Sequence, residues 1–323
     1  MPGVTTATAP DKADPRGWLP GFLLLAAIWG SSFLFIKVGV AELHPLYVTL
    51  GRALAGAVTL LVVMLLTRDR LPRDPRIWLH LTVTGVIGVA MPFTLFGYGE
   101  ERVSSSLAGI WNATTPLLVL PLAVFVFRTE RMTAQRAAGL LVGFAGVLVV
   151  LGVWAGVGGS HFTGQLMCLV AAACYGVVIP YSKRYVADRP ESAIALSAGQ
   201  LITATVVLAI VSPLVAGAPT PVTDLSAKAV ASILTLGAVG TGLAFVINLR
   251  NIKLAGATTA SMVTYLIPVC AVLLGVLALD EHITWHQPVG ALIVLLGVAI
   301  SQGVFARRRK PTPAPATPEA ELV

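Results

Sequence analysis

The sequence is poor in charge. Only 11% of its 323 residues are Asp, Glu, Lys or Arg, whereas 56% are hydrophobic. Soluble domains carry about 25% charged residues because their surface has to be polar. A shortage of this size excludes an ordinary soluble protein, and the high hydrophobicity excludes a disordered chain, so most of the surface must face lipid.

Cysteines and nucleotide-binding motifs are also scarce. Cys168, Cys174 and Cys270 lie inside apolar runs, without the spacing of a disulfide framework or a zinc site. No Walker-type G-x-x-x-x-G-K-[ST] motif occurs. We therefore expect no metal, no cofactor and no ATPase domain in this chain.

Carboxylates are missing from the middle of the apolar runs. All fifteen Asp and Glu fall in a loop, in a tail or at the end of a predicted helix. An ionisable residue at the bilayer centre is costly and usually marks a proton relay or an ion site. Its absence argues against tight proton coupling and favours a neutral or zwitterionic ligand, although aromatic rings would still allow a cation to bind.

What the sequence does contain is a series of long apolar runs. A helix needs about 20 apolar residues to cross a bilayer. Ten runs approach that length, and short connections between them leave no room for a soluble domain. The sequence thus predicts an all-α integral membrane protein with ten transmembrane helices, at about 18–38, 45–66, 78–98, 104–127, 134–154, 163–182, 192–216, 228–248, 256–279 and 286–305.

The distribution of basic residues predicts the orientation. If the N-terminus is cytoplasmic, eighteen of the 22 Lys and Arg lie in inner segments, three in outer segments and Arg52 alone within a span. Cytoplasmic loops retain positive charge. Both termini are therefore expected in the cytoplasm, and the net charge of +7 reflects topology rather than a nucleic-acid partner. Residues 1–16 and 307–323 are predicted to be disordered tails.

The two halves resemble each other. Ile28-Trp29-Gly30 with Lys37 matches Cys174-Tyr175-Gly176 with Lys183, and Glu130-Arg131-Met132-Thr133 matches Glu281-His282-Ile283-Thr284. This predicts two five-helix repeats, 17–155 and 156–306. Because five is odd, the second repeat enters the membrane from the opposite side, which gives inverted repeats with a substrate site near mid-depth and alternating access.

The order of these motifs resembles the drug/metabolite transporter superfamily, in particular its ten-helix EamA type with two EamA repeats. The resemblance rests on Trp29-Gly30-Ser31-Ser32 with Lys37, His44-Pro45 with Gly51-Arg52, the series Thr115-Pro116, Glu130 and Gly146, and the series Ile267-Pro268, Glu281 and Gly297. One departure is Thr129-Glu130 and Asp280-Glu281 where the family has Gly-Glu. The resemblance implies a multi-pass secondary transporter of the cell membrane, not an enzyme, which exports a small metabolite such as an amino acid.

Polar and aromatic residues near mid-depth are the candidate substrate-binding set, and two interior prolines are candidate helix breaks, since each removes a backbone hydrogen bond. The plainer interpretation is that these side chains only pack helices together. The substrate-binding candidates are Trp29, Asn112, Thr115, Tyr175, Thr241, Ser261 and Tyr265, and the helix breaks are Pro116 and Pro268.

Four charged residues are candidates for a gate or a structural contact: Lys37, Arg52, Glu100 and Lys183. Arg52 needs a partner, and Glu42, Glu100 or Glu101 would make it an outer brace. The alternative is a contact with a substrate carboxylate or an outer gate. Lys37 and Lys183 either extend to the membrane interface or act as matched gate residues. The pairs Gly139/Gly146 and Gly290/Gly297 are expected to pack helices closely.

The sequence leaves two other functions open and disfavours a third. The same fold would also serve for efflux of amphipathic or cationic drug-like compounds. A membrane scaffold or assembly subunit that transports nothing is a different class. An intramembrane enzyme is disfavoured because no Asp-rich helix ends and no Ser and His at depth occur. The expected partners are a small-molecule substrate and the lipid bilayer, with no nucleic acid, and a homodimer stays open.

Overall fold

The computed structural model describes residues 15–128, 130–152, 154, 159–187, 189–255, 260, 263–302 and 304. All regular secondary structure in these residues is helical, and eight helices within them are long and apolar enough to cross a membrane. Two shorter apolar helices, Val263–Leu279 and His286–Ser301, lie where the last two spans were expected. This confirms the membrane-protein fold class. The count of ten spans and the cytoplasmic position of both termini stay predictions.

The helices follow one another with short connections. The first half contains α1 (Pro15–Val40), α2 (Pro45–Thr67), α3 (Pro75–Gly85), α4 (Met91–Glu100), α5 (Ser105–Asn112), α6 (Thr115–Pro121) and α7 (Ala134–Leu151). The second half contains α8 (Gly159–Tyr185), α9 (Ala193–Ala216), α10 (Ala227–Gly237), α11 (Ala244–Ala255), α13 (Val263–Leu279) and α14 (His286–Ser301). Three π-helical segments adjoin these helices: η1 (Val86–Ala90), η2 (Leu122–Val126) and η5 (Ala238–Leu243).

Local sequence sets where several helices begin. A serine directly before α5, α9 and α10 accepts a hydrogen bond from a backbone N–H of the first turn, which satisfies a donor that the helix itself cannot. Ser104 accepts from Leu107, Ser192 from Ala195 and Ser226 from Ala229. Proline occupies the first position of α2 and α3, where its missing N–H removes no hydrogen bond.

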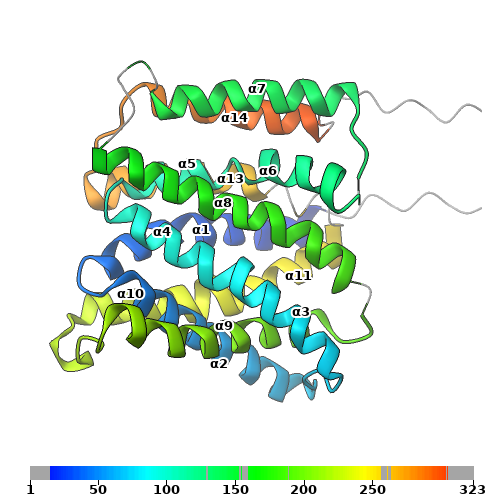
Figure 1. Cartoon of the computed structure of the whole chain (residues 1–323), viewed down its shortest axis with the longest axis vertical. Helices are drawn as coiled ribbons and strands as arrows, with labels where there is room; N and C mark the ends of the chain where they lie inside the picture. The colour runs from blue at the N-terminus through cyan, green and yellow to red at the C-terminus, as the bar shows by residue number, and fades with distance from the viewer. Residues whose placement is uncertain are drawn as a thin grey trace, which may run out of the picture.

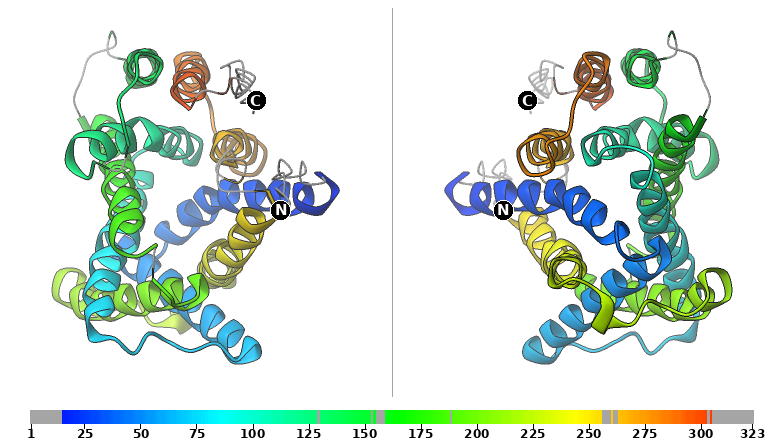
Figure 2. Two further views of the ribbon diagram at one scale, coloured as in Figure 1. Left: turned by 90° about the vertical axis from the view of Figure 1, so that its right-hand side faces the viewer. Right: turned by 90° about the vertical axis from the view of Figure 1, so that its left-hand side faces the viewer.

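The helices stack in layers (Figure 1). Helices α7 and α14 form an outer layer beside α5, α6, α8 and α13. Helices α2, α3, α9 and α10 lie at the opposite side of the molecule. Turned by 90°, α7 and α14 are seen almost end-on above the remaining helices (Figure 2). Helices far apart in sequence therefore pack side by side, such as α1 against α13 and α2 against α9.

Glycines bring α7 and α14 together, as the sequence indicated. A Cβ added to Gly146 would lie 2.6 Å from the backbone nitrogen of Val294, and one added to Gly290 would lie 2.6 Å from that of Val150. Real Cβ atoms do not approach backbone this closely. The two helices thus pack backbone to backbone, as small residues permit in a membrane.

The outside of the helix bundle is apolar. Leu65, Leu214 and Leu277 are 79%, 80% and 77% exposed, respectively. Contiguous apolar exposure on this scale marks a surface that contacts lipid or another protein rather than water. Fully buried side chains, such as Trp111 and Leu25, form the packed interior.

Candidate functional site

A cavity of about 830 Å³ lies between the two halves of the chain. It is lined by residues of α1, α2, α4, α5, α6, α7, α8, α11, α13 and α14, so both sequence repeats contribute to it. Its volume suits a small molecule. The cavity brings together eight residues that the sequence singled out, namely Trp29, Arg52, Asn112, Thr115, Pro116, Tyr175, Lys183 and Thr241.

The break predicted in the fourth span lies beside this cavity. Helix α5 ends at Asn112 and α6 begins at Thr115, directly before Pro116. The Thr115 hydroxyl donates to the Asn112 carbonyl over 2.8 Å, which satisfies a backbone acceptor that the interruption frees. The interruption thus turns Asn112, Thr115 and Pro116 toward the cavity together.

Other predicted residues lie elsewhere. Ser261 lies outside the described residues. Tyr265 packs against the buried core and its hydroxyl has no hydrogen-bond partner within the described part of the chain, while Pro268 sits in α13 without interrupting it, so the second expected break is wrong. Neither residue lines the cavity, nor do Lys37 and Glu100.

Phenylalanines form much of the lining, and sequence reasoning missed them. Phe33, Phe93, Phe96 and Phe245 all face the cavity. The Phe33 and Phe96 rings lie 5.5 Å apart between centroids, and Phe96 stacks on Tyr175 at 6.5 Å. The sequence does carry a signal for two of them, since Phe93 and Phe245 are separated by 152 residues, close to the repeat distance.

The three π-helical segments all contribute to the lining. Gly88 of η1, Ala123 of η2, and Gly240 and Thr241 of η5 face the cavity. Segments η1 and η5 occupy matching places in the two repeats, since Gly88 and Gly240 are also 152 residues apart. π-helical turns are rare and occur frequently at functional sites.

Arg52 is buried at the cavity wall. Its Nε donates to the Thr241 hydroxyl over 3.0 Å, and its guanidinium carbon lies 3.6 Å from the centre of the Phe93 ring. Within the described part of the chain, the expected ion pair with an outer carboxylate is not formed, and Glu100 acts on Arg52 only over a longer distance. Instead Glu42 binds Ser226, Glu101 pairs with Arg102, and both Glu100 carboxylate oxygens lack a hydrogen-bond partner among the described residues.

One end of the cavity reaches a cluster of charges. Glu130 accepts from Arg136 at 2.7 Å and from Lys183 at 3.3 Å, and all three residues line the cavity. We call this cluster the mouth. Lys183 thus pairs with a carboxylate rather than extending freely.

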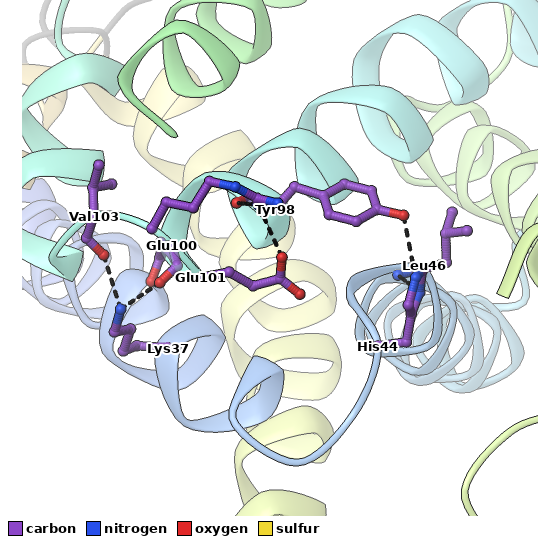
Figure 3. A network of polar contacts seen from close by, with 8 residues as sticks. Lys37, His44, Leu46, Tyr98, Glu100, Glu101 and Val103 are labelled. Carbon is purple, nitrogen blue, oxygen red and sulfur yellow. Dashed lines mark hydrogen bonds and ion pairs between the residues drawn. The ribbon is translucent and has the colours of Figure 1, made fainter. Parts of the chain in front are cut away.

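The opposite end is held together by a polar network (Figure 3). Lys37, at the end of α1, donates to the backbone carbonyls of Glu100 and Val103, the latter over 2.9 Å. Its ammonium thus meets the C-terminal carbonyls of α4, where a cation is favoured. On the other side of this view the Tyr98 hydroxyl lies 3.3 Å from His44 Nε2. Lys37 therefore connects α1 to the α4–α5 turn instead of extending to the interface.

Glu281 joins the two repeats at this end of the bundle. Its carboxylate accepts from the backbone nitrogens of Ser105 and Ser106 over 2.6 and 3.0 Å, and from the Ser106 hydroxyl over 2.5 Å. An anion at a helix N-terminus satisfies free N–H groups and interacts favourably with the helix dipole. The second repeat thereby caps a helix of the first.

Known proteins are similar to this sequence over most of its length. The profile of the EamA-like transporter family matches residues 17–152 and 162–302, once in each half. The chain belongs to the EamA-like transporter family. The predicted family is thus confirmed, and the chain is a multi-pass membrane transporter. The family consists of transporters, in agreement with the class of protein that the sequence predicted.

Individual EamA-like relatives are similar from end to end. The uncharacterized transporter YoaV of Bacillus subtilis (strain 168) is 28% identical, and the match covers 90% of this chain and 98% of YoaV. The uncharacterized inner membrane transporter YedA of Escherichia coli (strain K12) is 28% identical, with 94% and 98% covered. A solved crystal structure shares the fold with a TM-score of 0.63 at 20% identity, covering 90% of this chain and 99% of that one.

Proposed function

We propose that this EamA-like protein is a secondary transporter of the cell membrane that exports a small neutral or zwitterionic metabolite, such as an amino acid or a related compound. The observation that carries the proposal is the central cavity, which both repeats line and which reaches the mouth at Glu130, Arg136 and Lys183. The residues that join Lys37 to the α4–α5 turn do not line it. A site accessible from one end is what alternating access requires.

The chemistry of the lining supports this class of substrate. Aromatic rings and an amide and hydroxyls surround the cavity, and the carboxylate among the described lining residues, Glu130, is already paired with two cations. A neutral or zwitterionic molecule is compatible with such a surface. The proposed binding residues are Trp29, Asn112, Thr115, Tyr175 and Thr241.

The mouth supports an inward-facing cavity. Arg136 and Lys183 belong to segments that the distribution of basic residues places on the cytoplasmic side. Substrate would then enter from the cytoplasm, as export requires. Inverted repeats, which would let the mouth close while the Lys37 end opens, remain part of the proposal.

Efflux of amphipathic or cationic drug-like compounds is the alternative that the aromatic lining favours. Phe33, Phe93, Phe96 and Tyr175 would stack on such compounds. Against it stands the charge of the wall, where three cations face one carboxylate.

Transport by the purified chain in liposomes tests the proposal. Candidate substrates are the metabolites that accumulate outside cells overexpressing the chain. Labelled forms of these metabolites are then loaded into liposomes with and without the protein. We expect protein-dependent movement of at least one neutral or zwitterionic compound. Movement of cations alone would favour drug efflux, and no movement of any compound would favour a scaffold.

A further inference from the structure

Arg52 presents unused hydrogen-bond donors to the cavity. The Thr241 hydroxyl donates to the Leu236 carbonyl over 3.0 Å, so its oxygen is free to accept from Arg52 Nε. That bond and the Phe93 ring on one face fix the orientation of the guanidinium. An arginine has five N–H donors, so the four on its two Nη atoms remain. Within the described residues they have neither a hydrogen-bond partner nor an ion pair.

Among the described residues no carboxylate lies within ion-pair distance of Arg52, and the buried Glu100 acts on its charge only from farther away. The ion pairs within the described residues are Arg102–Glu101, Arg136–Glu130, Lys183–Glu130 and Arg189–Asp74. A buried cation away from water is strongly disfavoured unless an anion accompanies it. An intramembrane arginine that faces a cavity is therefore a candidate contact for a ligand.

The second repeat indicates that the fold does not need this charge. Gly51-Arg52 of α2 corresponds to Gly199-Gln200 of α9. A Cβ added to Gly237 would lie 2.6 Å from the Arg52 carbonyl oxygen, and one added to Gly85 would lie 2.7 Å from that of Gln200. The same close helix contact thus forms beside a neutral side chain, which donates to the Thr84 carbonyl over 3.1 Å.

The geometry points to Arg52 as the anchor of a substrate carboxylate, which its two Nη atoms bind in the forked arrangement that guanidinium and carboxylate share. This rests on the proposed function and directs it to compounds that carry a carboxylate and an apolar body, which contacts Phe93, Phe96 and Trp29. Zwitterionic amino acids fall within the proposed class, and monocarboxylate anions would extend it. Amino acids and simple monocarboxylates share this chemistry. Arg136 and Lys183 do not compete, because Glu130 already pairs with both.

Binding to the purified full-length chain in detergent tests the inference. Four six-carbon probes differ only in their polar groups: hexanoate, 2-aminohexanoate, hexanamide and hexylamine. The shift of the thermal unfolding midpoint is titrated with each. We expect hexanoate or 2-aminohexanoate, or both, to raise the midpoint more than hexanamide or hexylamine. Binding of 2-aminohexanoate alone identifies the zwitterion as the class, and binding of both identifies the carboxylate itself.

Two variants test the residue. Arg52→Gln copies the residue of the second repeat and should weaken carboxylate binding about tenfold or more. Arg52→Lys keeps the charge without the two parallel N–H donors, so its carboxylate affinity should lie between those of the unmodified chain and Arg52→Gln. Gln200→Met is the matched control and should bind as the unmodified chain does. The midpoint shift caused by hexanamide should be the same in all of these variants.

Three results would overturn the inference. They are equal midpoint shifts by hexanoate and hexanamide, carboxylate binding that survives Arg52→Gln unchanged, and no shift by either carboxylate at tens of millimolar. The proposed function fails separately. If carboxylates bind through Arg52 but no compound moves in liposomes, the binding site stands and the transport function is refuted. If compounds move at rates that do not depend on Arg52, the transport function stands and the role of Arg52 is refuted.

Discussion

Glu281→Gln should loosen the end of the bundle that Lys37 and Glu281 hold together, and so increase opening at that end. The substitution keeps one acceptor oxygen but removes the negative charge at the start of α5. A charge at a partly buried helix N-terminus contributes up to about 2 kcal/mol. A hydrogen bond to a charged acceptor is stronger than one to a neutral acceptor by about 1 kcal/mol. Because Glu281 is only half-buried, we take about 2 kcal/mol for both effects together, which raises the open population about 30-fold.

Labelling of a cysteine at position 105 measures that population. Ser105 is fully buried and its hydroxyl has no hydrogen-bond partner among the described residues, so Ser105→Cys should be tolerated. With Cys168, Cys174 and Cys270 replaced by alanine, a water-soluble maleimide should react in proportion to opening. We expect Glu281→Gln to raise the rate about 30-fold.

Glu130→Gln is the matched control for this experiment. Glu130 holds the same place in the first repeat but pairs with Arg136 and Lys183 at the mouth. Its substitution should leave labelling at position 105 unchanged or slower. If Glu281→Gln reacts no faster than its parent, the Glu281 contact does not hold this end closed and our reasoning is wrong.

Three further changes test other parts of the structure. Trp29→Ala should abolish transport in liposomes while the unfolding midpoint stays near that of the parent, and unchanged transport kinetics would remove Trp29 from the site. Gly297→Val should push α14 away from α7 and lower the free energy of unfolding by about 1–3 kcal/mol, whereas an unchanged midpoint in a denaturation series would contradict the backbone contact. Hydrogen bonds from Ser226 lower the pKa of Glu42 below its usual value of 4.5, so the stabilisation that Glu42→Gln removes is present above that value and disappears as the pH falls through the lowered pKa. The difference in unfolding midpoint between parent and variant should shrink from pH 7 to pH 3, and a difference that persisted would place its origin elsewhere.

Several features of the fold follow from the sequence because they depend on periodicity and composition. Apolar runs gave the helices, and the glycine pairs gave the contact of α7 with α14. Trp29 and Tyr175 were found because the same pattern surrounds each of them in its own repeat. Such signals are repeated along the chain and do not depend on how distant helices meet.

Other parts of the site depend on how helices that are distant in sequence pack together. A phenylalanine in an apolar span gives no indication of which face it occupies, so Phe93 and Phe96 were missed, and Tyr265 turned toward the core instead. Glu100 was placed correctly at a helix end, but its full burial comes from the helices packed around it. Pro268 remains inside α13 because one proline can be accommodated in a helix, as membrane helices often do.

The two repeats keep the residues of their close helix contacts but differ at a position of the cavity wall. Gly85 and Gly237 make the same close helix contact, and Gly88 and Gly240 occupy matching π-helical segments. Beside these shared positions, Arg52 corresponds to Gln200. The backbone contacts require glycine and tolerate little change, whereas a cavity-facing side chain has no tightly packed neighbour on one side. Substrate preference in such a fold can therefore change by single substitutions at the wall without loss of the bundle. In this chain, the charge at Arg52 is such a departure from symmetry, and it faces the proposed substrate site.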